Sequence, residues 1–283
     1  MEVPGTVSRI LWHFTGGHSQ DGFTGTRSDK RKSLEEAFRL VKLVLESKEL
    51  KVSKISEVYW MLNPGGLTYK EYHSKYLGYE ISEDSYQEFP VCCLSDIPVQ
   101  HLKYQASRYG ECAIGFYRES AILHGFSPVF YITEDSEVLN SIMSGLSDTL
   151  NNQLEQGLDL FSYVIPDPDT MYGKDAWQEA EEEKEEIQNN IAAISEVIKQ
   201  VRLSMKRFVS FIKIFGTDEF NTIYAEREWR SLNAFSFNEN DIAMIIVPKK
   251  NGCYHDLVNS GLVSKETPVI PWEDLLEYEP INR

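Results

Sequence analysis

The stretch FPVCCLSDIPVQHLKYQASRYGECAIGFY, residues 89–117, decides the fold class. It opens with an apolar run of strand length, FPVCCLS, and closes with another, CAIGFY. Between them, Pro98 suits the first turn of a short helix, and Gly110 ends that helix. The stretch therefore predicts strand, helix and strand in succession, which is typical of a mixed α and β fold.

The sequence before this stretch predicts a further strand and a longer helix. RILWHFT, residues 9–15, has the pattern of a buried strand that ends in polar residues, and a loop rich in Gly, Ser and Thr follows at 16–28. Ser33 and Glu36 form a capping-box pattern, in which the serine serves a helix amide and the glutamate reaches back. Apolar residues at helical spacing continue this helix to about residue 47.

Beyond the opening stretch, the chain alternates between strands and a long helical region. Apolar runs of strand length lie at 128–133, 209–216, 223–232 and 241–248. Residues 134–165 have a helical pattern, and PDPDT at 166–170 breaks it. We expect one α+β domain whose core is formed by 1–133 and 209–283, with a helical insertion at 134–208.

The strongest periodicity lies inside the insertion. Apolar residues alternate spacings of four and three, which is the pattern of a coiled-coil seam, at Ile187, Ile191, Ile194, Ile198, Val201, Met205 and Phe208. This heptad seam has two interpretations. It is one arm of an antiparallel helical hairpin packed on 134–165, or it is a docking surface for a partner chain or a second copy.

The composition predicts a soluble cytoplasmic protein. With 42% hydrophobic and 25% charged residues, the chain is not typical of a disordered protein. We find no apolar run long enough for a signal peptide or a membrane span, and the four cysteines form no disulfide or metal motif. The net charge of −16 repels nucleic acid at long range, and EAEEEKEE at 179–186 indicates a solvated helix face.

The segment YAEREWR, residues 224–230, is the strongest candidate site. On a strand, Glu226, Glu228 and Arg230 would share one face, because side chains alternate between faces. Burying these charges is costly unless they pair with each other or with a ligand. The segment is therefore either a functional site or an exposed edge strand whose charges meet water.

Three residues elsewhere are secondary candidates. His13 ends the first strand, where it is a hydrogen-bonded core residue or a ligand contact; Thr15 and the glycine-rich loop after it favour the ligand contact. Ser95 ends the strand 89–95 and either caps a turn or faces the same cleft. The sequence has no phosphate-binding loop, dinucleotide fingerprint, nucleophile elbow or HExxH motif, which argues against those enzyme classes.

Three blocks in order resemble the AbiGi family of bacterial abortive-infection proteins: LWHFT near the start, VCCLSDIPVQHLKYQASRYGECAIGFYR in the middle and YAEREWR near the end. The middle block is the most specific. One departure is Leu94, where a wider group of similar proteins has phenylalanine, and it leaves the role of Ser95 open. The resemblance implies a phage-defence toxin–antitoxin pair, in which the AbiGi protein is the antitoxin.

The order of these residues also resembles that of ADP-ribosyltransferases, which implies an ADP-ribosyltransferase-like core and NAD as a substrate. The implied cofactor-binding residues are His13, Thr15, Ser95 and Arg230. Glu228 would stabilise the positive charge of an oxocarbenium-like transition state, and Glu226 would orient or deprotonate the acceptor. An arginine, Arg27 or Arg108, would bind the pyrophosphate.

Two main hypotheses follow, and both place the protein in phage defence. In the first, it is an effector that uses NAD to modify a macromolecule. In the alternative, it is a non-catalytic antitoxin or adaptor that binds and neutralises a partner toxin through the helical segment 187–208, and the negative charge suits a basic toxin. A nuclease is a third possibility, but it needs clustered carboxylates for metal ions, and the sequence offers one Glu pair.

Overall fold

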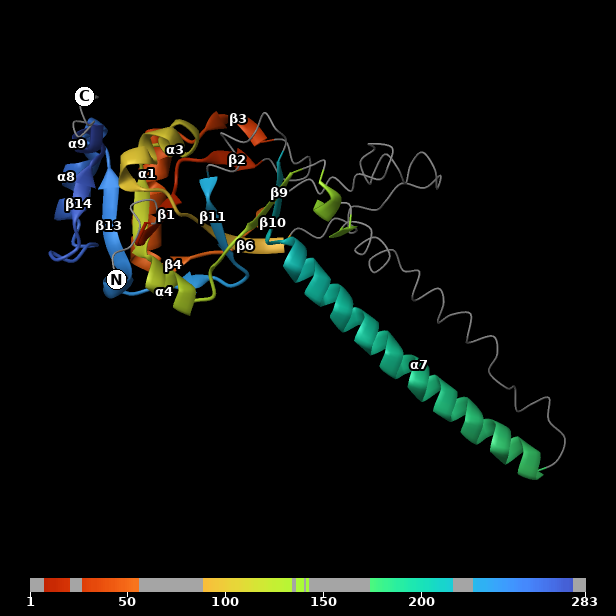
Figure 1. Cartoon of the computed structure of the whole chain (residues 1–283). Coiled ribbons are helices and arrows are strands. Elements are labelled where there is room, and N and C mark those ends of the chain that lie inside the picture. The colour runs from red at the N-terminus through yellow and green to blue at the C-terminus, as the bar shows by residue number, and fades with distance from the viewer. Residues whose placement is uncertain are drawn as a thin grey trace, which may run out of the picture.

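The computed structural model describes residues 8–20, 27–55, 89–133, 136–139, 141–142, 174–215 and 226–276 (Figure 1). The strands are β1 (Ile10–Phe14), β2 (His18–Gln20), β3 (Arg27–Arg31), β4 (Glu49–Leu50), β5 (Ser53–Ile55), β6 (Phe89–Ser95), β7 (Ala113–Tyr117), β8 (Ser127–Pro128), β9 (Phe130–Thr133), β10 (Ile212–Phe215), β11 (Glu228–Ser231), β12 (Phe235–Ser236), β13 (Ile242–Val247) and β14 (Val269–Pro271). The α-helices are α1 (Leu34–Ser47), α3 (Leu102–Tyr109), α4 (Arg118–Leu123), α7 (Lys174–Val209), α8 (Cys253–Asn259) and α9 (Trp272–Leu276). Short 3-10 turns lie at Val99–His101, Glu239–Asp241 and Lys250–Gly252. The predicted α+β class is confirmed.

The main sheet brings the two ends of the chain together. Its strands follow the order β14-β13-β7-β1-β6-β11-β8, and β5 pairs with β6 at the side of this path. β6 lies between β1 and β11 and is antiparallel to both. LWHFT, VCCLS and EWR therefore lie on three neighbouring strands, although they are far apart in the sequence.

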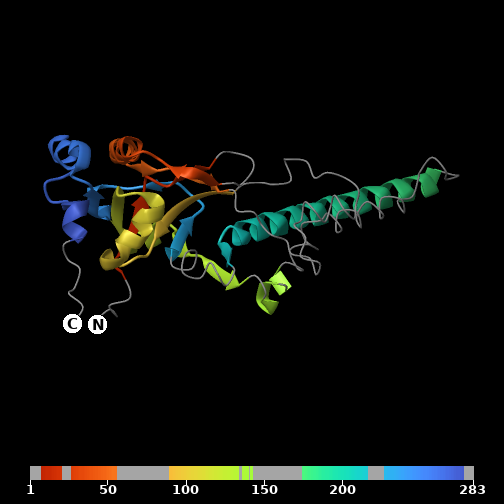
Figure 2. The same cartoon turned by 90° about the horizontal axis from the view of Figure 1, so that it is seen from above.

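The sheet is covered on both faces by helices (Figure 2). On the α1 face, Leu11, Ile114 and Phe116 pack in one apolar cluster with residues of α1, α4 and α8. On the α3 face, Trp12 and Ala113 pack in a second cluster with residues of α3 and α9. Each strand of the middle of the sheet thus contributes alternate residues to two separate cores.

Several predicted strands agree closely with the structure, and three need correction. The predicted strand 89–95 is β6. The predicted strand 128–133 is two strands, because β8 pairs with β11 whereas β9 pairs with β10. The predicted strand 209–216 begins only at Ile212, because α7 continues through Val209. Of the predicted strand 223–232, residues 223–225 lie outside the described residues, and β11 begins only at Glu228.

Local signals fix the ends of two helices. The Ser33 side chain accepts a hydrogen bond from the Glu36 amide at 3.2 Å, as the capping pattern predicts. Gly110 ends α3 with φ +80°, a conformation that favours glycine. Gly16 packs against this turn, and a Cβ on Gly16 would lie 2.7 Å from the Tyr109 carbonyl oxygen. The two glycines therefore allow the end of β1 to approach the end of α3.

The long helix α7 extends away from the sheet in both views (Figures 1 and 2). Its 36 residues span about 54 Å and include the whole heptad seam. The other predicted arm of the hairpin, 134–165, and the break at 166–170 lie outside the described residues, apart from 136–139 and 141–142. The predicted division into core and insertion therefore stays a prediction.

Candidate functional site

A kink at Arg227 shapes the start of the candidate site. Arg227 has φ +44°, a left-handed conformation that is unusual for a residue other than glycine. Asp96 stabilises the kink: its amide donates to the Arg227 carbonyl at 2.9 Å, and its carboxylate accepts from the Arg227 guanidinium at 2.9 Å. Strand alternation predicted that Glu226 and Glu228 share a face, but Glu226 precedes the strand, so their shared position has another cause.

That cause is Lys213, which lies on β10. Its ammonium group donates to Glu226 Oε2 at 2.5 Å and to Glu228 Oε2 at 2.7 Å. The lysine side chain is only 8% exposed, so this contact lies in a region of low effective dielectric. One buried cation therefore holds both glutamates together.

Two arginines and a tyrosine complete the cluster. Arg230 donates to both oxygens of Glu228, at 3.0 and 3.1 Å, in the bidentate geometry that guanidinium groups favour. Arg108 and Tyr109, at the end of α3, each contact Glu226 Oε1 at 2.7 Å. We call Arg108, Tyr109, Lys213, Glu226, Glu228 and Arg230 the glutamate cluster.

The glutamate cluster lies between β11 of the main sheet and the two-stranded sheet β9–β10, whose strand β10 follows α7. Arg230 donates to the carbonyl of Ser210, just after α7, at 2.6 Å. The Glu228 amide donates to the Tyr131 hydroxyl on β9 at 2.6 Å. Lys213 adds the contact from β10, the strand that follows α7. The cluster therefore fixes the β9–β10 pair, and with it the base of α7, to β11.

The charges of the cluster determine the protonation of Glu228. Burial by itself raises the pKa of this carboxyl, but the neighbouring Lys213 and Arg230 outweigh that effect and hold the pKa well below its ordinary value. Burial also raises the pKa of the Tyr109 phenol, and the Glu226 carboxylate adds to this effect. Glu228 is therefore ionised and Tyr109 is protonated at neutral pH.

The low pKa of Glu228 predicts an acid-sensitive contribution to stability. A carboxyl with a lowered folded-state pKa stabilises the protein fully above its unfolded pKa of about 4.3, and this stabilisation is lost as the pH falls toward the folded value. The difference in unfolding free energy between wild type and Glu228→Gln should therefore be constant from pH 8 to about pH 5.5 and shrink below about pH 4.5. Urea unfolding at a series of pH values measures it. A difference that persists unchanged at pH 3 would contradict the prediction.

The register of the sheet separates His13 from Glu228. Trp12 pairs with Ser95, and Ser95 pairs with Glu228, so these three side chains share the α3 face. His13 follows Trp12 and therefore lies on the α1 face, where it pairs with Ile114. Its Nδ1–H donates to the Cys93 carbonyl at 3.3 Å. Burial lowers its pKa despite this hydrogen bond, so the imidazole is neutral at pH 7.

The other predicted site residues divide in the same way. Thr15 is buried and donates its hydroxyl to the Ala37 carbonyl of α1 at 2.8 Å, so it fastens the end of β1 to that helix. Ser95 and Arg230 lie with Glu228 on the α3 face. The expectation of one cleft lined by His13 and the two glutamates is therefore corrected by the strand register. NAD binding itself stays a prediction.

The sequence did not single out Lys213, Tyr109 or Tyr131 as site residues. Lys213 had a usable signal, because it is the one charged residue within the apolar run FIKIF at 211–215. Arg108, a candidate for pyrophosphate binding, pairs with Glu226, and its binding of pyrophosphate stays a prediction. Arg27, the other candidate, begins β3.

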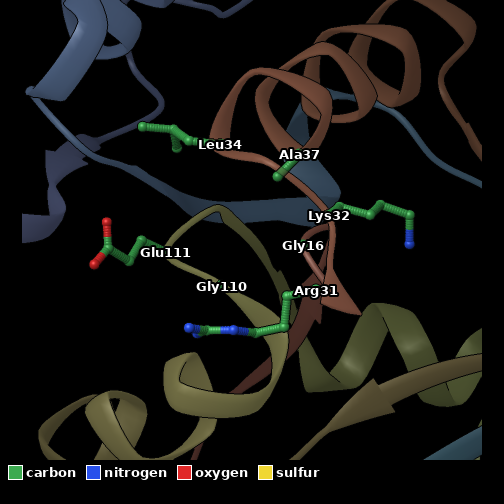
Figure 3. A pocket seen from close by; sticks show the side chains of 7 residues that line it. All are labelled: Gly16, Arg31, Lys32, Leu34, Ala37, Gly110 and Glu111. Carbon is green, nitrogen blue, oxygen red and sulfur yellow. The ribbon is translucent and has the colours of Figure 1, made fainter. Parts of the chain in front are cut away.

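A cleft of about 470 Å³ lies beside the glycine pair (Figure 3). It is lined by Gly16, Arg31, Lys32, Leu34, Ala37, Gly110 and Glu111, which include neither His13 nor the two glutamates. The two basic side chains point in opposite directions in Figure 3. Arg31 donates to the Ala106 carbonyl of α3 at 3.1 Å, and Lys32 donates to the Gly17 carbonyl in the loop after β1 at 3.0 Å.

Comparison with known proteins identifies the family. No curated protein and no solved structure matches this chain, and the likeness of the core to ADP-ribosyltransferases stays a prediction. Among the described residues, no helix is both long and apolar enough to cross a membrane. The sequence model for abortive phage resistance protein AbiGi, antitoxin, matches residues 67–260, which is more than half of the 283 residues. The chain therefore belongs to the AbiGi family of abortive phage resistance proteins.

Proposed function

We propose that this protein is the antitoxin of a phage-defence pair and neutralises its partner toxin by direct contact through α7. The observation that carries the proposal is the family match over 67–260, which bears the description antitoxin and contains the whole of α7. This match favours the antitoxin hypothesis over the effector hypothesis.

The exposure of the heptad seam supports α7 as the contact surface. Apolar side chains of this helix are widely exposed: Ile194 by 48%, Val201 by 42% and Phe208 by 41%. Contiguous exposed apolar surface is rare on monomeric proteins and marks surfaces that bind partners. An amphipathic helix with anchors at heptad spacing suits a groove or another helix on the toxin.

The charge of α7 indicates which kind of toxin surface would be complementary to this helix. Residues 179–186, near the free end of the helix, contain six glutamates and one lysine. A toxin surface with an apolar groove and basic side chains at one end of it would be complementary to both the apolar seam and the glutamates at 179–186. Charge complementarity of this kind increases the association rate and suppresses wrong partners.

The geometry of the glutamate cluster favours a structural role for Glu228 over a catalytic one. Both of its carboxylate oxygens are held by buried cations, and the side chain is 9% exposed. Stabilising a transition state requires a carboxylate that faces the developing charge of the substrate. We therefore assign Glu228 to the joint between sheet and α7, and ADP-ribosyl transfer remains the alternative that the following experiment distinguishes.

The test is a growth assay with three inducible bacterial strains, which express the partner toxin alone, this chain alone, or both. We expect the toxin alone to stop growth, the chain alone to have no effect, and the pair to grow and yield a complex on co-purification. Toxicity of the chain alone, with NAD consumption by the purified wild-type protein, would instead support the effector hypothesis. Growth without a stable complex would contradict neutralisation by direct contact.

A further inference from the structure

We infer that α7 pairs in antiparallel orientation with α7 of a second copy of this chain, through the heptad seam. The seam is suited to helix pairing because its apolar residues recur at alternating spacings of four and three. The apolar side chains remain substantially exposed, Ile194 by 48% and Val201 by 42%. The helix also projects away from the main sheet in both views (Figures 1 and 2).

The charge distribution along α7 determines the orientation. Residues 179–186 carry six glutamates against one lysine, whereas residues 199–207 carry four basic residues and no acid. Two antiparallel copies place the acidic part of each helix beside the basic part of the other. A parallel pair would place acid beside acid and base beside base, and like charges across a helix interface are destabilising.

The same charges distinguish a second copy from the segment 134–165 as the occupant of the seam. That segment contains six acidic residues and no lysine or arginine. It therefore offers no cation to the acidic part of α7 at 179–186. A second α7 supplies the basic segment 199–207 to that part, and it also supplies a matching apolar seam.

Self-pairing has a consequence for toxin capture, and this consequence alone rests on the proposed function. If the toxin binds the same seam, each captured toxin must displace one copy of the chain. Dissociation of the dimer is then linked to neutralisation, and the apparent affinity for the toxin falls as the concentration of the antitoxin rises. The free antitoxin thereby covers its own apolar surface until a toxin is present.

Analytical ultracentrifugation of the purified full chain, without toxin, tests the pairing. We expect a concentration-dependent dimer. The double variant Ile194→Glu/Val201→Glu should bind itself at least about 1000-fold more weakly, because the dimer would bury two glutamates from each copy in an apolar contact. The control Asn189→Glu/Ala192→Glu adds the same charge at exposed positions away from the seam and should remain dimeric. A wild-type chain that is monomeric at high micromolar concentration would overturn the inference.

Spin labels test the orientation. A label at Gln178→Cys, an exposed position near the free end of α7, should give a distance of about 40 Å between copies in the antiparallel pair. A parallel pair would bring the two labels close together. The four native thiols should react slowly with the label, because burial raises the pKa of Cys92, Cys93, Cys112 and Cys253. A short distance would overturn the antiparallel arrangement.

Charge reversal separates this inference from the proposed function. Arg202→Glu should weaken the dimer on the order of tenfold at low salt, and adding Glu181→Lys in the same chain should restore it, because both positions flank the seam in the heptad pattern. Rescue is expected only if the two parts of α7 face each other across copies. A dimer that is absent in a chain that still protects cells from the toxin would end the self-pairing inference and leave the antitoxin proposal standing.

Discussion

Cells that express the partner toxin together with the Ile194→Glu/Val201→Glu variant should fail to grow, as they do with the toxin alone. The proposed contact buries this part of the seam against the toxin. An ionised carboxylate that is buried without a partner costs several kcal/mol, so two of them should reduce affinity by at least about 1000-fold. Colony counts after toxin induction measure the effect.

The variant leaves the helix itself intact, because glutamate is a good helix former and both positions are exposed in the single chain. Circular dichroism and the urea midpoint should match wild type at protein concentrations low enough to keep the wild type monomeric. The Asn189→Glu/Ala192→Glu control should protect cells fully. Full protection by the seam variant, at wild-type expression levels, would show that the toxin contact lies elsewhere.

Glu228→Gln should lower the free energy of unfolding by about 3–5 kcal/mol, the range typical of breaking a buried ion pair by removing one partner. The substitution keeps the shape of the side chain but leaves Lys213 and Arg230 close together without the carboxylate that both contact. Equilibrium urea unfolding at pH 7 measures the change. Glu239→Gln is the matched control, because its partner Lys48 lies in an exposed pair, and it should cost less than about 0.5 kcal/mol.

Lys213→Met should cost less than Glu228→Gln. Without the lysine, the Arg108–Glu226 and Arg230–Glu228 pairs remain, so each carboxylate keeps a cation. Methionine also fills most of the volume of the lysine stem. If Lys213→Met proved the more damaging change, the two arginines would not suffice to neutralise the glutamates, and our assignment of charges in the cluster would be wrong.

The sequence predicted the secondary structure well in segments whose apolar residues follow one clear periodicity. The apolar run 89–95 predicted β6 with its observed bounds, and the heptad seam lies within one continuous helix. The capping serine at position 33 and the glycine at 110 mark helix ends, because each signal acts over a few residues. The resemblance to the AbiGi family rests on sequence motifs alone.

The candidate site was only partly predictable, because its geometry depends on contacts between distant residues. Glu226 and Glu228 were chosen from the sequence, but alternation along a strand could not foresee the kink at Arg227. Lys213 reaches the glutamates from another strand, and Arg108 reaches Glu226 across 118 positions of sequence.

The sequence by itself determined the α+β class, the main strands, the long amphipathic helix and the family, because periodicity, caps and motifs are local properties. Only the tertiary structure decided where the charged residues of YAEREWR lie and which partners they contact. Strand register places His13 and Glu228 on opposite faces of one sheet, since a shift of one residue moves a side chain to the other face. Contacts from β10 and α3 then bury Glu226 and Glu228 against Lys213 and Arg108 at the base of α7, which alternation along one strand does not reveal.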